Sequence, residues 1–145
     1  MDDRCRSALV IEDDEDTRDV LIMLLTVLGL EVREARNGQE ALETLKTWRP
    51  DLIVLDLMMP VMNGWAFRSE QKRMPEARDI PVIVLSARQP PFRPEDELDV
   101  AELLPKPFEL DTFLSAVARH CPGLAASAPS WLRPEAEARQ HVSLR

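Results

Sequence analysis

The sequence predicts an α/β fold built on a doubly wound, five-stranded parallel sheet, and three observations support this prediction. Short apolar runs alternate along the chain with segments of helical periodicity. Most of these runs are continuously apolar rather than alternating, which is typical of strands that are covered on both faces. The chain has 145 residues, which suits a single domain of this class.

The expected elements follow one another in a regular order of strand and helix. Strands are expected at 8–11, 30–35, 52–55, 81–85 and 101–104. Helices are expected at 15–28, 39–48, 64–74 and 110–120. Gly29 stands where a helix ends in the left-handed conformation. The run QPPFRP, at 89–94, disfavours a regular helix, so the fourth helix is expected to be short, irregular or disordered.

Composition and charge exclude several classes of function. Eighteen Lys and Arg residues against 26 Asp and Glu residues give a net charge of −8, which argues against a nucleic-acid-binding surface. The longest apolar run, 20–25, is far shorter than the about 20 residues that cross a bilayer. The first residues, MDDRCRS, lack the apolar segment of a signal peptide. We therefore expect a cytoplasmic protein that contacts neither nucleic acid nor membrane.

Two cysteines, Cys5 and Cys121, are too few for a disulfide scaffold. Two reduced thiols in a cytosolic protein are the simplest expectation. As an alternative, both residues are expected at the edge of the sheet remote from the strands' carboxyl ends, where they could be neighbours. A Cα separation above about 7 Å would exclude a direct bond between them.

Polar residues follow the predicted strands at the edge where a doubly wound sheet places its working site. They are Glu12 and Asp13 after the first strand, Asp56 after the third, Ser86 after the fourth and Lys106 after the fifth. Each alone has an ordinary explanation, such as a helix cap, a turn residue or a solvated charge. Acids that converge repel one another, however, and Mg²⁺ is the hard cation that binds through few carboxylates.

These residues lie in motifs that resemble the receiver, or phosphoacceptor, domain of two-component response regulators, over about residues 7–120. The matching segments are LVIEDD (9–14), LDLMMP (55–60) followed by Gly64, Ser86-Ala87, and Lys106-Pro107-Phe108. The resemblance implies a flavodoxin-like or CheY-like sheet with strand order 2-1-3-4-5. It also implies a cis peptide bond between Lys106 and Pro107.

The resemblance further implies a role for each residue of the site. Asp56 would be the phosphoacceptor, and Ser86 and Lys106 would hold the phosphoryl oxygens. The cofactor would be Mg²⁺, bound by Glu12, Asp13, Asp56 and the backbone carbonyl of Met58. An ionised carboxylate needs no general base to attack phosphorus once cations offset the repulsion between the two anions.

The expected function is that of a stand-alone receiver that switches conformation, and not of an enzyme acting on other substrates. Its partners would be a sensor histidine kinase or a histidine phosphotransfer protein, and a downstream protein target. Residues 1–121 would form the receiver and 122–145 a proline-containing tail without an output domain. A degenerate receiver that acts as an interaction module is the alternative, favoured by Leu103 where the family usually has an aromatic residue. A metal-dependent phosphatase is disfavoured because Met58 stands where its second Asp is expected.

The first helix is expected to carry apolar residues on both of its faces. Helical periodicity predicts a core face of Thr17, Leu21, Leu24, Leu25 and Leu28. It leaves Ile22, Met23 and Val27 outside that face, and exposed apolar residues of this kind need a cover. Three candidates remain open for the cover: a histidine kinase, the tail segment with Trp131 and Leu132, and a second copy in a homodimer.

Overall fold

A computed structural model describes residues 5–57, 59, 61–86 and 100–124 of the chain. Its elements are β1 (Ser7–Ile11), α1 (Glu15–Val27), β2 (Glu31–Ala35), α2 (Gly38–Leu45), β3 (Leu52–Asp56), α3 (Gly64–Gln71), β4 (Val82–Ser86), β5 (Glu102–Pro105) and α5 (Leu110–His120). The strands form one parallel sheet in the order β2-β1-β3-β4-β5, which confirms the predicted fold class and strand order. The predicted fourth helix lies outside the described residues.

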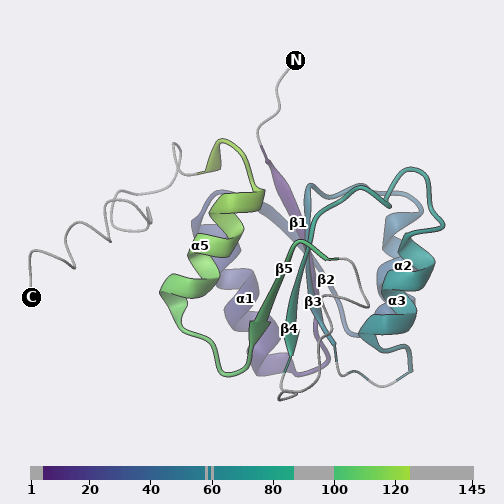
Figure 1. Cartoon of the computed structure of the whole chain (residues 1–145), viewed down its shortest axis with the longest axis horizontal. Coiled ribbons are helices and arrows are strands. Elements are labelled where there is room, and N and C mark those ends of the chain that lie inside the picture. Colours follow the sequence, from purple (N-terminus) through teal and green to yellow (C-terminus); the bar gives the residue numbers. More distant parts are fainter. Residues whose placement is uncertain (1–4, 58, 60, 87–99, 125–145) are drawn as a thin grey trace, which may run out of the picture.

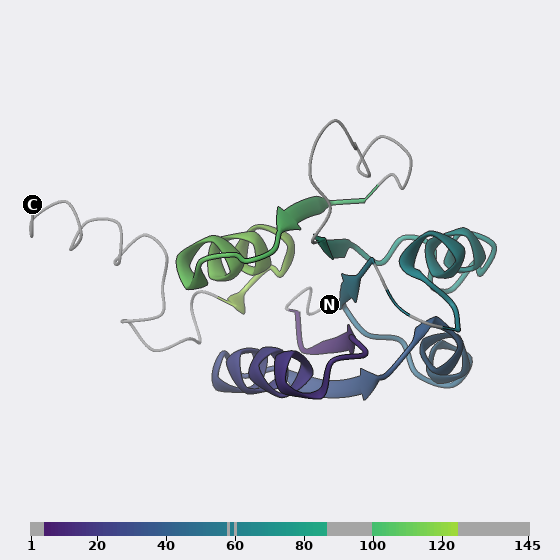
Figure 2. The ribbon, with the colours of Figure 1, turned by 90° about the horizontal axis from the view of Figure 1, so that it is seen from below.

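Helices cover both faces of the sheet, α1 and α5 on one and α2 and α3 on the other (Figures 1 and 2). Successive side chains of a strand point to opposite faces, so each central strand contributes to two cores. In β1, Ala8 and Val10 pack in the core under α1 and α5, whereas Leu9 and Ile11 pack in the core under α2 and α3. Every residue of β1, β3 and β4 is buried, which explains why these strands are apolar apart from Ser7, Asp56 and Ser86 at their ends.

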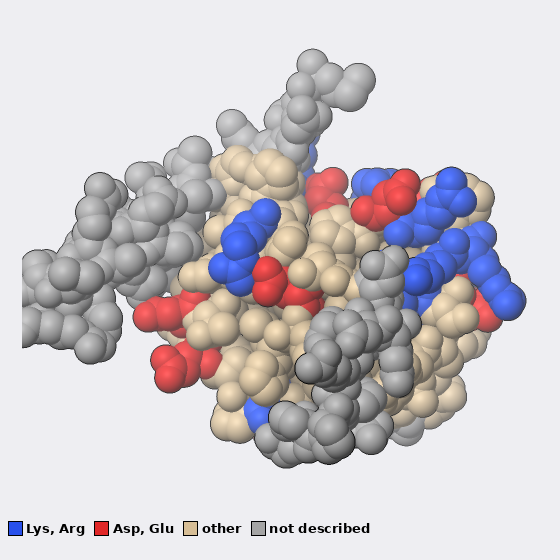
Figure 3. All heavy atoms as spheres, in the orientation of Figure 1, with Lys and Arg blue, Asp and Glu red and all other residues tan. Residues whose placement is uncertain are grey.

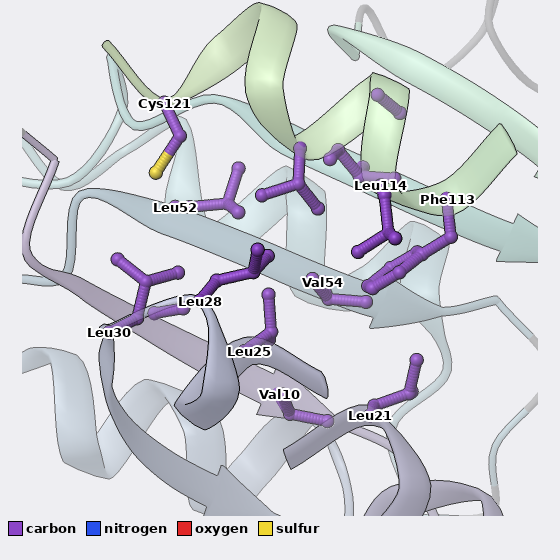
Figure 4. Packing of buried hydrophobic residues seen from close by; sticks show 14 of the residues in the cluster. Val10, Leu21, Leu25, Leu28, Leu30, Leu52, Val54, Phe113, Leu114 and Cys121 are labelled. Carbon is purple, nitrogen blue, oxygen red and sulfur yellow. The ribbon is translucent and has the colours of Figure 1, made fainter. Parts of the chain in front are cut away.

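The core under α1 and α5 holds these two helices against the sheet (Figure 4). Leu21 and Leu25 of α1 and Phe113 and Leu114 of α5 surround Val54 of β3, and all of them are buried. Each fully buried side chain of this size contributes about 1.5–3 kcal/mol to folding. The helices that frame the carboxyl edge of the sheet are therefore fixed by packing.

Side-chain caps determine where three of the helices begin. The side chain of Asp14 accepts a hydrogen bond from the backbone N–H of Thr17 at the start of α1. Asn37 and Asn63 cap α2 and α3 in the same way. Because the cap of α1 comes three residues after β1, only a short acidic loop separates the strand from the helix.

Helix α1 departs from its prediction in which residues it exposes. Ile22 is half-buried and packs against the core under α1 and α5, so its predicted place on the outer face was wrong. The buried arc of α1 is wide because this helix packs against the sheet and beside α5 at once. The apolar side chains that remain exposed are Val20, Met23 and Val27, at 49%, 56% and 46%. We call these three residues the α1 stripe.

Cys5 and Cys121 form a disulfide, with their Cα atoms 5.0 Å apart. The expectation of two reduced thiols was therefore wrong, and the alternative that places the two residues side by side is right. The bond joins Cys5, two residues before β1, to Cys121, directly after α5, across 116 residues of sequence. The N–H of Cys5 also donates to the carbonyl of Pro122 at 2.8 Å. Among the described residues, no helix is long and apolar enough to span a membrane.

Candidate functional site

The register of the sheet brings the predicted site residues to one edge. Glu12 and Asp56 lie side by side because each comes directly after the last residue pair of β1 and β3. Ser86 ends β4, and Lys106 directly follows β5, the neighbouring strand. The N–H of Lys106 donates to the carbonyl of Ser86 at 2.7 Å, which holds these two residues together.

Three carboxylates form a compact group at this edge. Ligand oxygens of Glu12, Asp13 and Asp56 all lie within 4.8 Å of one another. Glu12 and Asp56 are only 1% and 4% exposed, whereas Asp13 faces solvent. Buried like charges at this separation repel strongly unless a cation lies between them. A set of hard carboxylate oxygens beside open solvent fits Mg²⁺, which keeps part of its water shell.

Lys106 supplies one positive charge to this group. Its Nζ lies 2.9 Å from Oε1 of Glu12 and 3.5 Å from Oδ1 of Asp56. Burial by itself lowers the pKa of Lys106, but the hydrogen bond to Glu12 and the charge of Asp56 outweigh burial and raise that pKa. The ammonium therefore stays charged at neutral pH, beside the group of three carboxylates.

The segment after Lys106 has the geometry that the resemblance implied. The Lys106–Pro107 peptide bond is cis. The ring of Phe108 then packs on that of Phe113 in α5, with the ring centroids 5.5 Å apart. Leu103, which stands where the family usually has an aromatic residue, is half-buried against the core under α2 and α3.

Asp14 has a different role from its two acidic neighbours. Its carboxylate accepts hydrogen bonds from the side chain and the backbone N–H of Thr17, and these bonds lower the pKa of Asp14. It therefore caps α1 and is not part of the compact carboxylate group. The backbone N–H of Asp14 in turn donates to Oε2 of Glu12 at 3.2 Å, which orients that carboxylate.

Sequence reasoning missed one residue beneath the site, Arg18. It is 7% exposed, and its Nη1 donates to the backbone carbonyl of Glu12 at 3.0 Å. The signal in the sequence is its position, one turn before the core residue Leu21 on the same side of α1. Met58, a predicted metal ligand, lies outside the described residues, and the other predicted site residues lie together at this edge.

The family model described as the response regulator receiver domain matches residues 8–118. The chain belongs to this family. Receiver domains are signalling domains that act with histidine kinases and downstream effectors in two-component systems, and they bind Mg²⁺ in an acidic pocket. The carboxylate group of Glu12, Asp13 and Asp56 is compatible with that pocket.

Solved structures agree with this assignment. The chemotaxis protein CheY4 of Vibrio cholerae superposes with a TM-score of 0.74 at 27% identity, over 80% of this chain and 98% of that one. The receiver domain of the sensor histidine kinase PA1611 of Pseudomonas aeruginosa superposes with a TM-score of 0.73 at 25% identity, over 80% and 97%. The latter structure has a magnesium ion coordinated in its active site cleft.

Curated relatives are longer than this chain. The response regulator MprA of Mycolicibacterium vanbaalenii is 36% identical over 109 residues, which are 74% of this chain and 46% of that protein. The probable transcriptional regulator ycf27 of Pyropia yezoensis is 37% identical over 87 residues, 60% of this chain and 35% of that protein. The chain thus spans less than half the length of these relatives.

Proposed function

We propose that Asp56 accepts a phosphoryl group from the phosphohistidine of a sensor histidine kinase or a histidine phosphotransfer protein. The observation that carries the proposal is the arrangement around this buried carboxylate. Lys106 lies 3.5 Å from it, and the oxygens of Glu12 and Asp13 lie within 4.8 Å. This combination gives Asp56 both a cationic partner and the acids that would hold a metal ion.

Glu12, Asp13 and Asp56 would hold Mg²⁺, and the carbonyl of Met58 remains a predicted fourth ligand. Bound Mg²⁺ would supply positive charge that offsets the repulsion between the Asp56 carboxylate and the incoming phosphoryl group. Lys106 would add to that effect from the protein side. Ser86, at the end of β4, would bind a phosphoryl oxygen once transfer has occurred.

The transfer itself is a displacement at phosphorus. A carboxylate oxygen of Asp56 forms a bond to phosphorus while the bond between phosphorus and the donor's imidazole nitrogen breaks. The imidazole keeps the electron pair and leaves as a neutral ring, with a proton on its other nitrogen. The reaction needs Asp56 as a carboxylate, and the ammonium of Lys106 at 3.5 Å favours that charged form.

We propose the remaining features of the function from the sequence. Residues 1–121 would form the receiver and residues 122–145 a tail, in a protein of the cytoplasm that signals to a downstream protein target. The net charge of −8 supports a protein partner over nucleic acid. Such a receiver would catalyse at most its own phosphorylation and dephosphorylation. The compact carboxylate group argues against the degenerate alternative.

The α1 stripe is the surface that we propose for docking of the kinase. Its apolar side chains are flanked on α1 by exposed Asp16 and Asp19, so a partner helix with apolar and basic residues would complement it. The resemblance to receivers, which dock kinase helices beside the first helix, favours the kinase. A fold-back of the tail and a homodimer are the other possible outcomes.

The test is incubation of the full chain with acetyl phosphate and Mg²⁺, followed by intact mass spectrometry. We expect a mass gain of one phosphoryl group that requires Mg²⁺ and disappears in Asp56→Asn. The matched control is Asp79→Asn, which changes an exposed Asp outside the site and should leave the mass gain unchanged. A wild-type chain without any Mg²⁺-dependent mass gain would instead support the degenerate interaction module.

A second arm of the same experiment uses a phosphorylated histidine kinase as the donor. Met23→Ser combined with Val27→Ser should slow transfer from the kinase about tenfold and leave transfer from acetyl phosphate unchanged. Equal loss with both donors, or no loss with either, would refute the docking surface. A shift to monomer in the variant would identify a homodimer instead.

A further inference from the structure

Arg18 is a buried cation in an unfavourable position. It lies in the first part of α1, where the positive end of the helix dipole disfavours another positive charge. It is also 7% exposed, so its guanidinium has lost most of its water. Two unfavourable terms therefore act on one side chain, and its contacts have to compensate for both.

Those contacts lead to the acidic loop. Nη1 of Arg18 donates to the backbone carbonyl of Glu12 at 3.0 Å, and Nε donates to Oε1 of Glu34 at 2.7 Å. Glu34 lies near the end of β2, and its side chain is 53% exposed. The planar guanidinium thus joins the end of β1 to the end of β2 from within α1, which a single-point donor such as lysine cannot do.

The hydrogen bond from Arg18 holds the backbone of Glu12, whose carboxylate accepts two further hydrogen bonds. Oε1 of Glu12 accepts from Lys106 at 2.9 Å, and Oε2 accepts from the N–H of Asp14 at 3.2 Å. The next residue, Asp13, carries the exposed member of the carboxylate group. Any rotation of the Glu12 peptide would therefore move both acids of this loop relative to Asp56.

We propose that Arg18, oriented by Glu34, is a positioning residue that sets the affinity of the carboxylate group for Mg²⁺. It acts through the backbone of Glu12 and touches neither the metal nor the phosphoryl group. Residues that orient metal ligands in this way typically change metal affinity about 10–100-fold when they are removed. The inference rests on the proposed function only in taking Mg²⁺ as the cation.

The test is calorimetric titration of the full chain with MgCl₂. Arg18→Gln should raise the Kd for Mg²⁺ about tenfold, and Arg18→Lys, which keeps the charge but loses the two-point contact, should raise it nearly as much. Arg36→Gln is the matched control. It removes the same charge from an exposed arginine that pairs with Glu40, and should leave the Kd within twofold of wild type.

A second readout separates positioning from general damage to the fold. At saturating MgCl₂, Arg18→Gln should be modified by acetyl phosphate at the wild-type rate, with only the Mg²⁺ concentration for half-maximal rate raised. An unchanged Kd in Arg18→Gln, or an equal rise in Arg36→Gln, would overturn the proposal. Because the titration needs no phosphotransfer, a failure of the proposed function would be seen separately, as a chain that binds Mg²⁺ normally but gains no mass.

If Arg18→Gln does not fold, Glu34→Gln decides the question. That substitution lies on a half-exposed side chain and removes only the partner that orients the guanidinium. We expect a rise in the Kd for Mg²⁺ of about threefold, with thermal unfolding in EDTA within a few degrees of wild type. A Kd equal to that of wild type would overturn the proposal.

Discussion

The amino ends and the carboxyl ends of the parallel strands form two opposite sides of the sheet, here called the amino edge and the carboxyl edge. These two edges differ in how their polar groups are satisfied. At the amino edge, the carboxylate of Asp51 accepts hydrogen bonds from the backbone N–H groups of Arg6 and Ser7, at 2.8 and 3.2 Å. The disulfide between Cys5 and Cys121 closes the same edge. At the carboxyl edge, the described part of the chain places three carboxylates beside Lys106.

This difference separates stability from chemistry. Contacts at the amino edge join segments far apart in sequence and leave the groups involved paired within the chain. Among the residues that the structure describes, the carboxyl edge has more negative than positive charge in a largely buried setting, which does not stabilise a fold. An arrangement of this kind is explained by a ligand that brings positive charge, so the amino edge maintains the fold in which the carboxyl edge can act.

Of the changes that test this difference between the two edges, removal of the disulfide is expected to have the largest effect on the free energy of unfolding. Replacing both cysteines, Cys5→Ser with Cys121→Ser, should lower the free energy of unfolding by about 4 kcal/mol, because the bond closes a very long loop of the unfolded chain. Urea unfolding in EDTA measures the change. The affinity for Mg²⁺ and the rate of phosphorylation should stay at their wild-type values under conditions where the variant is folded.

The wild-type chain treated with a reducing agent is the control for this substitution. It should lose the same free energy of unfolding as the double variant, since both lack the bond. A loss below about 1 kcal/mol would show that the bond adds little to stability. A changed affinity for Mg²⁺ in the folded variant would show that the two edges are not independent.

Much of the fold and of the site could be predicted because they follow from local pattern and register. β1, β3 and β4 are buried on both faces, so their sequences show the pattern directly. Once five parallel strands are placed, their carboxyl ends must meet, and the convergence of Asp56 and Lys106 follows without any knowledge of side-chain contacts.

The features that could not be predicted depend on contacts between distant segments. From the sequence alone, Arg18 would be expected to be a solvated charge. Its role depends on Glu34 of β2, which lies next to it only in the folded chain. From helical periodicity, Ile22 would be expected to be exposed. It is half-buried because it packs against the core that α1 shares with α5. The pairing of the two cysteines depends on where the end of α5 lies relative to the start of β1. None of these is a property of a single helix or strand.

A smaller effect is expected from removing one charge at the carboxyl edge. Asp13→Asn should raise the free energy of unfolding in EDTA by about 1 kcal/mol, because Asp13 lies within 4.8 Å of two like charges and remains accessible to solvent. The same variant should lose most of the stabilisation that Mg²⁺ gives the wild type by binding to the folded state. Thermal unfolding with and without MgCl₂ measures both effects.

Asp111→Asn is the matched control for this charge. It removes an exposed carboxylate in the first turn of α5, away from the acidic group, and should not raise stability in EDTA. If Asp13→Asn also leaves the stability in EDTA unchanged, the repulsion at the carboxyl edge is already screened by solvent. The two edges would then differ in the arrangement of their side chains, and not in the electrostatic repulsion between them.

The smallest effect concerns the ion pairs of the amino edge. Basic and acidic side chains adjoin over β5 and α5 (Figure 3), where Oε2 of Glu102 accepts from Arg119 at 2.8 Å and lies 3.0 Å from Nε2 of His120. The hydrogen bond from Arg119 lowers the pKa of Glu102 below its usual 4.5. A lowered folded-state pKa stabilises the fold above about pH 4.5, and this stabilisation is lost as the pH falls through the folded-state value.

Glu102→Gln should therefore lower the free energy of unfolding at pH 7 by less than about 0.5 kcal/mol, because Arg119 is half-exposed and solvent screens the pair. Urea midpoints of the variant and the wild type should converge as the pH falls below 4.5, and also in 1 M salt at pH 7. A difference that persists in 1 M salt at pH 7 would mean that Glu102 acts through packing. A difference at pH 7 as large as that of the disulfide would mean that the ion pair stabilises this edge as much as the covalent bond does.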